Sequence, residues 1–341
     1  MPRGDAMRFG ITFAVTGGHK PVDEQFQEHV SQIQVAEECG FDSAFVSEHH
    51  FIGDFVSSPL VALAYIAAKT STIRLGTGLT LLPLHDPVRL AEDSAVLDVV
   101  SGGRLIMGIG QGYRPEEFAG FHRRLEDRRG LMREGAILLR KLWTERKVTF
   151  EGEHFQTDGL SLSPAPIQKP PPIWVGAKAK RAIELAAEIG DCWYADPITP
   201  LDLITERKVA WLAALAEHGK DPADQDLAYY REFHVGDDDE KAWDVGGRAI
   251  TGEYMAYLRF NHLTDKAGKA IPADRTDLVE GVVRDRCTVG GPAAVIDDLH
   301  AVKDALDPTD MILKMSYGGM TNEQVHDAIR LTADQVIPAV A

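Results

Sequence analysis

Glu48, His49 and His50 follow one another where an apolar segment ends, in FVSEHHF (residues 45–51). Imidazole and carboxylate groups can hold a metal ion, exchange protons or hydrogen-bond a bound molecule. Neighbouring side chains on an extended segment point to opposite faces, so only one of the two histidines can enter a given site. Because the sequence shows no obvious His-x-His or His-Glu-x-x-His pattern, we expect no metal, although ligands from distant strands stay an alternative.

Two interpretations of the histidines remain open from the residues alone. One imidazole could act as a general acid or base, or could hydrogen-bond a ligand. A histidine at the end of a strand is also often just a hydrogen-bonded part of the fold. The residues by themselves favour this second, structural interpretation.

A second candidate site lies in WVGAKAKRA (174–182), where a strand, one glycine and the start of a helix follow each other. Free N–H groups and the helix dipole favour an anion there. Lys178, Lys180 and Arg181 oppose that dipole unless an anion neutralises them, so the pattern favours a phosphate site over a solvated basic helix end. The glycine-dense GIGQGYRPEEF (108–118) is a weaker signal for close approach of a flat ligand.

Short apolar runs alternate with amphipathic stretches along the chain, and these elements must position the candidate residues. The predicted strands are 8–15, 43–47, 73–82, 104–110, 172–177, 192–195, 228–235 and 311–316. The predicted helices are 23–40, 58–70, 88–103, 129–143, 179–190, 199–219, 292–306 and 321–337. Such alternation predicts an α/β fold, a (β/α)8 TIM barrel whose chemistry lies at the C-terminal strand ends. An open doubly wound sheet is the alternative, but no G-x-G-x-x-G follows the first strand.

Two long stretches interrupt the alternation. Residues 145–171 combine a hairpin-like VTFEGEHFQ with a proline-rich segment. Residues 236–288 begin with the acidic GDDDE and contain DKAGKAIPADRTD, a glycine- and charge-rich loop. Insertions of this length are often functional lids or mobile loops, and a peripheral excursion is the equal alternative. No domain boundary is evident, so we expect a single domain over 1–341 with an insertion or lid at about 236–288.

The composition disfavours several other classes of protein. The formal net charge is −16, and an acidic surface repels nucleic-acid backbones. Cys39, Cys192 and Cys287 lie far apart with no C-x-x-C, which argues against a disulfide framework and suits a reducing compartment. No apolar run is long enough to span a bilayer, and the N-terminal stretch lacks a signal-peptide pattern. We therefore expect a cytoplasmic protein with no nucleic-acid or membrane partner.

Several blocks of the sequence resemble the bacterial luciferase-like flavin-dependent monooxygenase family. They are AEECGFDSAFVSEHHF, IRLGTGLTLLPLHDPVRLAEDSAVLDVVSGGRLIMGIGQGY, PPIWVGAKAKRAIELAAEIGDCWY, DRCTVGGPAAVIDDL and DMILKMSYGGM. The resemblance is strong over residues 8–115 and 164–195 and weak over 196–280. It implies a (β/α)8 barrel with a long insertion after the seventh strand. It also implies reduced FMN and dioxygen as the oxidising system, and an NAD(P)H-dependent flavin reductase that supplies the reduced FMN.

The resemblance gives roles to individual residues. His49 corresponds to the family's catalytic histidine beside the flavin. Gly78 and Leu79 correspond to a pair that family members join by a cis peptide bond under the flavin ring. Gly110 and Gln111 stand where the light-emitting enzymes have a reactive cysteine and a phosphate-binding arginine. Light emission is therefore not expected, and the phosphate site is weakened unless another cation compensates.

The stretch around Ala177 and Lys178 corresponds to a phosphate-contacting segment of the family, in agreement with the helix start described above. Lys178 or Arg181 would be the compensating cation. The full set of expected cofactor-binding residues is Thr77, Gly78, Leu79, Gly110, Gln111, Gly176, Ala177, Lys178, Ala179 and Arg181.

The expected function is an FMN-dependent two-component monooxygenase that oxidises a small organic substrate. The alternatives are a deazaflavin-dependent dehydrogenase of the same fold, a flavin-binding paralogue without catalysis, and a metal-dependent barrel hydrolase that uses His49 or His50. Family members commonly form homodimers through helices near the second and third strands, and the apolar helix 59–68 is compatible with this arrangement.

Overall fold

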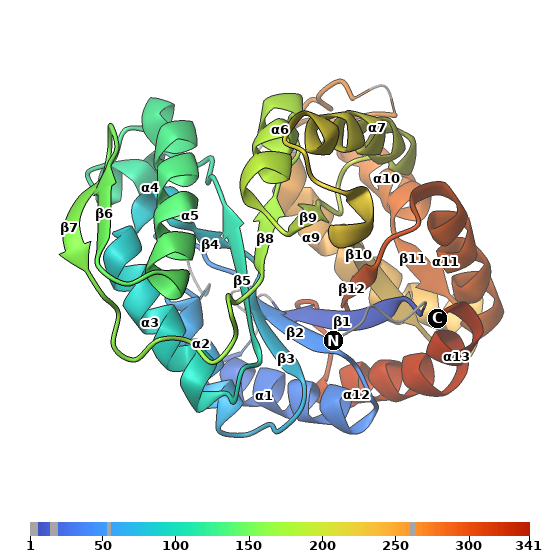
Figure 1. Ribbon diagram of the computed structural model, residues 1–341. Helices are drawn as coiled ribbons and strands as arrows, with labels where there is room; N and C mark the ends of the chain where they lie inside the picture. Colours follow the sequence, from blue (N-terminus) through green and yellow to red (C-terminus); the bar gives the residue numbers. More distant parts are fainter. Residues whose placement is uncertain (1–5, 14–19, 53–55, 260–262, 267) are drawn as a thin grey trace.

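The computed structural model describes residues 6–13, 20–52, 56–259, 263–266 and 268–341. Its centre is a closed barrel of parallel strands (Figure 1). In order around the barrel these are β1 (Arg8–Phe13), β2 (Ser43–Val46), β3 (Arg74–Thr77), β5 (Leu105–Gly110), β8 (Ile173–Gly176), β9 (Cys192–Ala195), β10 (Asp226–Val235) and β12 (Asp310–Lys314). Pairing of β12 with β1 closes the ring. The predicted (β/α)8 barrel is confirmed.

Helices pack around the outside of the barrel. They include α1 (Val22–Glu38), α2 (Pro59–Ala67), α3 (Pro87–Val100), α5 (Arg128–Thr144), α6 (Lys180–Ile189), α7 (Leu201–Glu217), α11 (Pro292–Leu306) and α12 (Asn322–Leu331). Each buries one apolar face; in α5, Leu131, Leu138 and Leu142 are buried at helical spacing. Shorter pieces are α4 (Pro115–Gly120), α13 (Ile337–Val340), η1 (Leu82–Leu84), η2 (Leu125–Asp127), η3 (Pro222–Asp224) and η6 (Thr332–Val336).

The expected single strand 73–82 is interrupted. β3 ends at Thr77, and a separate β4 (Thr80–Leu81) pairs with β5. The peptide bond between Gly78 and Leu79 is cis, as the family resemblance implied. This break puts Gly78 and Leu79 at the C-terminal mouth of the barrel.

An antiparallel hairpin of β6 (Val148–Glu151) and β7 (Gln156–Leu160) follows α5, as the sequence predicted. It lies outside the ring of helices beside α5 (Figure 1). The proline-rich segment after it contains two cis X-Pro bonds, Ser163–Pro164 and Lys169–Pro170.

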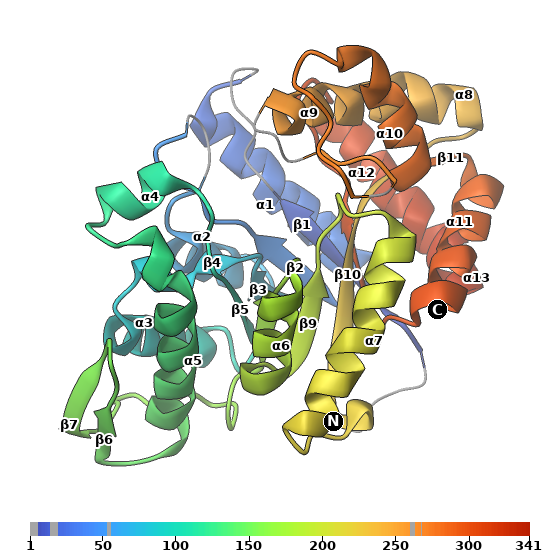
Figure 2. The same cartoon turned by 90° about the horizontal axis from the view of Figure 1, so that it is seen from above.

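The segment after β10 contains helices on both sides of the expected glycine- and charge-rich loop. Its described residues form α8 (Asp239–Ala242), η4 (Trp243–Gly247), α9 (Arg248–Arg259), η5 (Thr276–Leu278) and α10 (Val279–Arg286), and then β11 (Thr288–Gly290) pairs with β10. Tyr254, Leu258 and Val283 are buried, so α9 and α10 are amphipathic helices despite their charge. Figure 2 shows α9 and α10 across the molecule from the hairpin.

The interior of the barrel is filled by side chains. Phe45, Ile106, Trp174, Tyr194 and Ile312 form a buried cluster inside it. The rings of Phe45 and Trp174 stack with centroids 5.2 Å apart. Among the described residues, this cluster fills the barrel below the C-terminal strand ends, so we expect a ligand of the barrel to bind above it, at the mouth.

Across the described ranges, no helix is both long enough and apolar enough to cross a membrane.

Candidate functional site

Glu48 anchors the loop that carries both histidines. It is buried, and its Oε1 accepts hydrogen bonds from Nε2 of His50 at 2.7 Å and Nε2 of His85 at 2.8 Å. Its Oε2 accepts from the Leu81 N–H at 3.3 Å. Burial by itself raises the pKa of Glu48, but the hydrogen bonds from His50 and His85 outweigh it and hold the pKa below its ordinary value.

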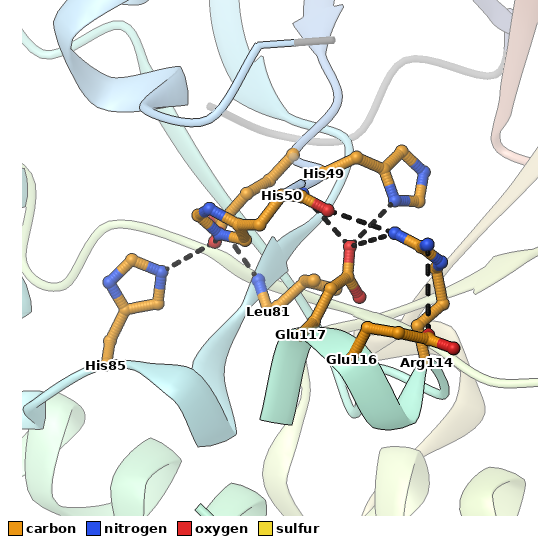
Figure 3. Close-up of polar contacts among 8 residues, drawn as sticks. His49, His50, Leu81, His85, Arg114, Glu116 and Glu117 are labelled. Carbon is orange, nitrogen blue, oxygen red and sulfur yellow. Dashed lines mark hydrogen bonds and ion pairs between the residues drawn. The ribbon is translucent and has the colours of Figure 1, made fainter. Parts of the chain in front are cut away.

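His49 faces the other way, toward Glu117 on α4 (Figure 3). Its Nδ1 lies 3.4 Å from Glu117 Oε1, and the same oxygen accepts from the His50 N–H at 3.0 Å. Burial raises the pKa of Glu117, but the contacts with His49 and the His50 N–H bring the pKa below its usual value. Arg114 donates to the His50 carbonyl at 2.9 Å and lies 3.5 Å from Glu117. The expected opposite orientation of the two histidines is confirmed.

Glu48 and His50, for which local support and surface were the two expectations, are both buried and hydrogen-bonded to each other, which agrees with local support and excludes the surface alternative. The structure also brings His85, a possible metal ligand from a distant part of the chain, close to Glu48 and His50. One possible ligand atom from each of the three residues lies within 4.8 Å of the other two. Two imidazoles and one carboxylate are a set that zinc uses. The three groups already satisfy one another by hydrogen bonds, which needs no ion. The absence of a metal stays a prediction.

Leu79 is held between glycines at the mouth. A Cβ on Gly176 would lie 2.0 Å from Leu79 Cδ1, and one on Gly110 would lie 3.2 Å from it. Thr77 is fully buried, and its hydroxyl donates to the Gly108 carbonyl at 2.5 Å. Gly78, Leu79 and Gly176 stay partly exposed and form part of the floor of the mouth. The structure thus brings together the expected residues of β3, β5 and β8.

The start of α6 lies beside further cations. Lys178 is partly buried, whereas Ala179 and Arg181 are exposed. Burial lowers the pKa of Lys178; Asp196 opposes this change, while Arg207 and Arg286 contribute to it. We call Lys178, Arg207 and Arg286 the cationic group. Asp196 follows β9 at the same end of the barrel.

Arg286 brings an available donor to this group. Its NH1 donates to the Ile198 carbonyl at 2.7 Å, and its NH2 donates to the carbonyl of Thr264. Its Nε is buried and has no hydrogen-bond partner among the described residues. Arg207 NH1 donates to the Thr199 hydroxyl at 3.1 Å. A buried donor next to several positive charges is chemistry that fits an anion.

Sequence reasoning missed several of these residues. Glu117 and Arg114 were within the glycine-dense stretch that drew attention for its backbone alone. Arg207 lies on α7 in the weakly matching region, where no motif marks it, and Arg286 lies on α10 in the matching block DRCTVGGPAAVIDDL, where no role was assigned to it. Only the fold brings them to the start of α6.

A sequence model of the luciferase-like monooxygenase family matches residues 7–308. The chain belongs to this family. The family resemblance drawn from the motifs is therefore confirmed, and the barrel with a cis peptide bond at its mouth agrees with it.

Relatives within the family differ in cofactor. The F420-dependent hydroxymycolic acid dehydrogenase of Mycobacterium tuberculosis is 33% identical over 213 residues, which is 58% of this chain and 57% of that protein. The oxygenase component of a flavin-dependent trigonelline monooxygenase from Acinetobacter baylyi is 28% identical over 223 residues, 64% of this chain and 61% of that one. The crystal structure of the monooxygenase RslO1 from Streptomyces bottropensis superimposes with a TM-score of 0.86 at 27% identity, covering 98% of this chain and 100% of that one. These comparisons support an oxidoreductase.

Proposed function

We propose that this protein is the oxygenase component of an FMN-dependent two-component monooxygenase. Reduced FMN and dioxygen would oxidise a small organic substrate at the mouth of the barrel. The observation that most supports this proposal is the presence of two distinct features at the same end of the barrel: an oriented histidine–carboxylate pair, His49 and Glu117, and the cationic group at the start of α6.

The cationic group would hold the FMN phosphate. A phosphate offsets the mutual repulsion of Lys178, Arg207 and Arg286, and the first N–H groups of α6 add donors. Gln111 stands where the light-emitting enzymes have a phosphate-binding arginine. Arg207 and Arg286 would compensate for the missing arginine, a role that the sequence suggested for Lys178 or Arg181. The flavin ring would lie over Gly78 and Leu79.

His49 would hold or move a proton next to the bound flavin. A carboxylate only accepts hydrogen bonds, and the lowered pKa of Glu117 keeps it ionised at neutral pH. Nδ1 of His49 therefore carries the hydrogen in the contact with Glu117. The other ring nitrogen, Nε2, would then be the atom that exchanges a proton with a bound molecule. When bound, FMN itself supplies the activation of dioxygen.

A deazaflavin-dependent dehydrogenase is the second candidate. Gln111 in place of the phosphate-binding arginine, together with the F420-dependent relative, favours it. The cationic group would bind the phosphate of either cofactor. The oriented His49–Glu117 pair argues against a paralogue without catalysis.

Three further assignments belong to this proposal. An NAD(P)H-dependent flavin reductase would supply reduced FMN. The segment 236–288 would cover the mouth as a lid. Two copies of the chain would form a homodimer through α2, where Val61 and Tyr65 are exposed beside a groove of about 360 Å3.

The proposal is tested by oxygen insertion. Protein with anaerobically reduced FMN is mixed with isotopically labelled dioxygen and a panel of aldehydes and ketones, and products are analysed by mass spectrometry. We expect label in a product, and a loss of turnover on the order of 10²-fold or more in His49→Ala. His218→Ala, at the exposed end of α7, serves as the matched control and should retain turnover. Label-free products throughout, with hydride transfer to a deazaflavin instead, would establish the second candidate.

A further inference from the structure

A second group of ionisable side chains lies inside the barrel, away from His49. Glu232 on β10 is the register partner of Lys314 on β12. Tyr230 and Ile312 pack against the cluster inside the barrel, and alternation along a strand puts Glu232 and Lys314 on the same inward face, one step nearer the mouth. Glu232 and Lys314 are fully buried.

Lys314 is already neutralised by another residue. Its ammonium group is paired with Glu253 of α9 and lies over the ring of Tyr317, 5.0 Å from the centroid. The Tyr257 hydroxyl donates to Glu253 at 2.9 Å. The Tyr317 hydroxyl donates to the Lys314 carbonyl at 2.6 Å. Glu253 thus engages the Lys314 ammonium group and the Tyr257 hydroxyl, while the Tyr317 hydroxyl donates to the Lys314 carbonyl and also acts to lower the pKa of Glu232.

The carboxyl group of Glu232 makes no close hydrogen bond to the described residues. Neither of its carboxyl oxygens has a hydrogen-bond partner in the part of the chain that the structure describes, and the buried hydroxyl of Tyr194 has none either. The rings of Tyr194 and Tyr230 lie 6.1 Å apart, and Tyr230 precedes Glu232 by two residues on the same inward face of β10. Burial raises the pKa of Tyr194, and the charges of Cys192 and Glu232 add to this rise.

The balance of charge makes Glu232 a neutral acid. One ammonium group faces two carboxyl groups, and a buried carboxylate without a partner is very costly. Burial raises the pKa of Glu232 to about 7, and Glu253 adds to this rise, whereas Lys314, the Tyr317 hydroxyl and Arg231 oppose it. Below that pH the carboxyl group carries a proton and can donate a hydrogen bond.

We propose that Glu232 and Tyr194 are a pair of hydrogen-bond donors that binds the carbonyl oxygen of an uncharged ketone or aldehyde. A carbonyl oxygen has two lone pairs and can accept from both groups. The aromatic rings of Tyr194 and Tyr230 would contact the apolar body of the ligand. This proposal rests on the proposed function in placing the substrate at the barrel mouth.

The same groups set a preference between ligand classes. The negative charge of a ligand carboxylate would lie beside Glu253 and would oppose ionisation of Glu232. Lys314 would not offset this charge, because it is already paired with Glu253. Uncharged carbonyl compounds should therefore bind better than carboxylates of the same shape, and their binding should weaken as pH rises through about 7, where Glu232 loses its proton.

The protonation of Glu232 is measured directly by infrared difference spectroscopy on the full chain as purified. We expect the carbonyl stretch of a neutral carboxylic acid at pH 6, its loss as pH rises through about 7, and its absence from Glu232→Gln. Glu151→Gln, on the exposed hairpin, should keep the signal. A signal that is missing from the native chain, or that persists in Glu232→Gln, would overturn the assignment. Thermal unfolding of each variant verifies that it is folded.

Ligand binding is measured with cyclohexanone and cyclohexanecarboxylate by calorimetry. We expect cyclohexanone to bind better, and Tyr194→Phe to weaken it about tenfold, the effect of one lost hydrogen bond. Its affinity should depend on pH around 7 in the native chain and not in Glu232→Gln. Affinity that is unchanged in both variants, or no binding of the ketone, would contradict the donor pair. Neither measurement uses a cofactor, so a failure of FMN binding is a separate result.

Discussion

Adjacent histidines in this chain have different partners because strand geometry separates them. His50 points to Glu48 and His49 to Glu117, an outcome that alternation predicts from sequence. The partners themselves could not be predicted. His85 lies 37 positions from Glu48 and Glu117 lies 68 positions from His49, and only the closed barrel brings such distant segments together.

Glu48→Gln should destabilise the protein. The amide nitrogen that replaces one carboxylate oxygen would face either the two imidazoles or the Leu81 N–H, and it cannot accept a hydrogen bond from either. We expect the free energy of unfolding at pH 7 to fall by about 1–3 kcal/mol, measured by chemical denaturation.

The pH dependence of this effect has a defined sign. The pKa of Glu48 is lower in the folded chain than in the unfolded one, so its stabilisation is present above about pH 4.5 and is lost as pH falls through the folded pKa. The difference between the native chain and Glu48→Gln should shrink in acid. A difference that grows below pH 4 would contradict this account.

The break between β3 and β4 is the element that shapes the barrel mouth. Glycine-dense strand ends predicted close approach to a flat ligand. In the structure, several of these glycines make room first for the chain itself: Gly110 and Gly176 accommodate Leu79, and Gly108 faces the Thr77 carbonyl oxygen. A sequence does not say which neighbour a glycine accommodates, because that neighbour lies on another strand.

Gly108→Ala should disrupt this junction. The added Cβ would lie 1.8 Å from the Thr77 carbonyl oxygen, a backbone atom that cannot rotate away. We expect a loss of about 3 kcal/mol or more in the free energy of unfolding. Gly252→Ala is the matched control: it has open space on α9 and should stabilise the helix by up to about 1 kcal/mol. Equal effects of the two substitutions would refute this explanation of the glycine.

At the scale of the whole molecule, the eight alternating units predicted the barrel correctly, because each unit carries its own apolar pattern. The insertion 236–288 was expected from the sequence, but the helices within it were not. The segment is rich in glycine and charged residues, which obscures its helical pattern in the sequence. The apolar residues of its helices, such as Tyr254 and Val283, are buried on one face only. Two features depend on that segment: Glu232 inside the barrel, through Glu253, and the cationic group at the start of α6, through Arg286. Neither could be recognised before the segment was placed.

The proposed homodimer is tested on the α2 surface. Val61 is 72% exposed, and a charge there would have to be buried between two copies of the chain. We expect Val61→Glu to be monomeric in sedimentation velocity under conditions where the native chain is a dimer. Val209→Glu, on α7 and 67% exposed, should leave the dimer intact. Dissociation in both variants, or in neither, would place the interface elsewhere.

Binding of a flavin-type cofactor at the barrel mouth is the central claim, and equilibrium titration with reduced FMN under anaerobic conditions tests it most directly. Titration with a reduced deazaflavin runs in parallel. The account predicts saturable binding of one FMN per chain, tighter than that of the deazaflavin. Lys178→Ala should weaken it about tenfold or more by removing one charge-assisted contact to the phosphate, whereas Lys141→Ala, on the outer face of α5, should not. No binding of either cofactor, or binding that Lys178→Ala leaves unchanged, would contradict it.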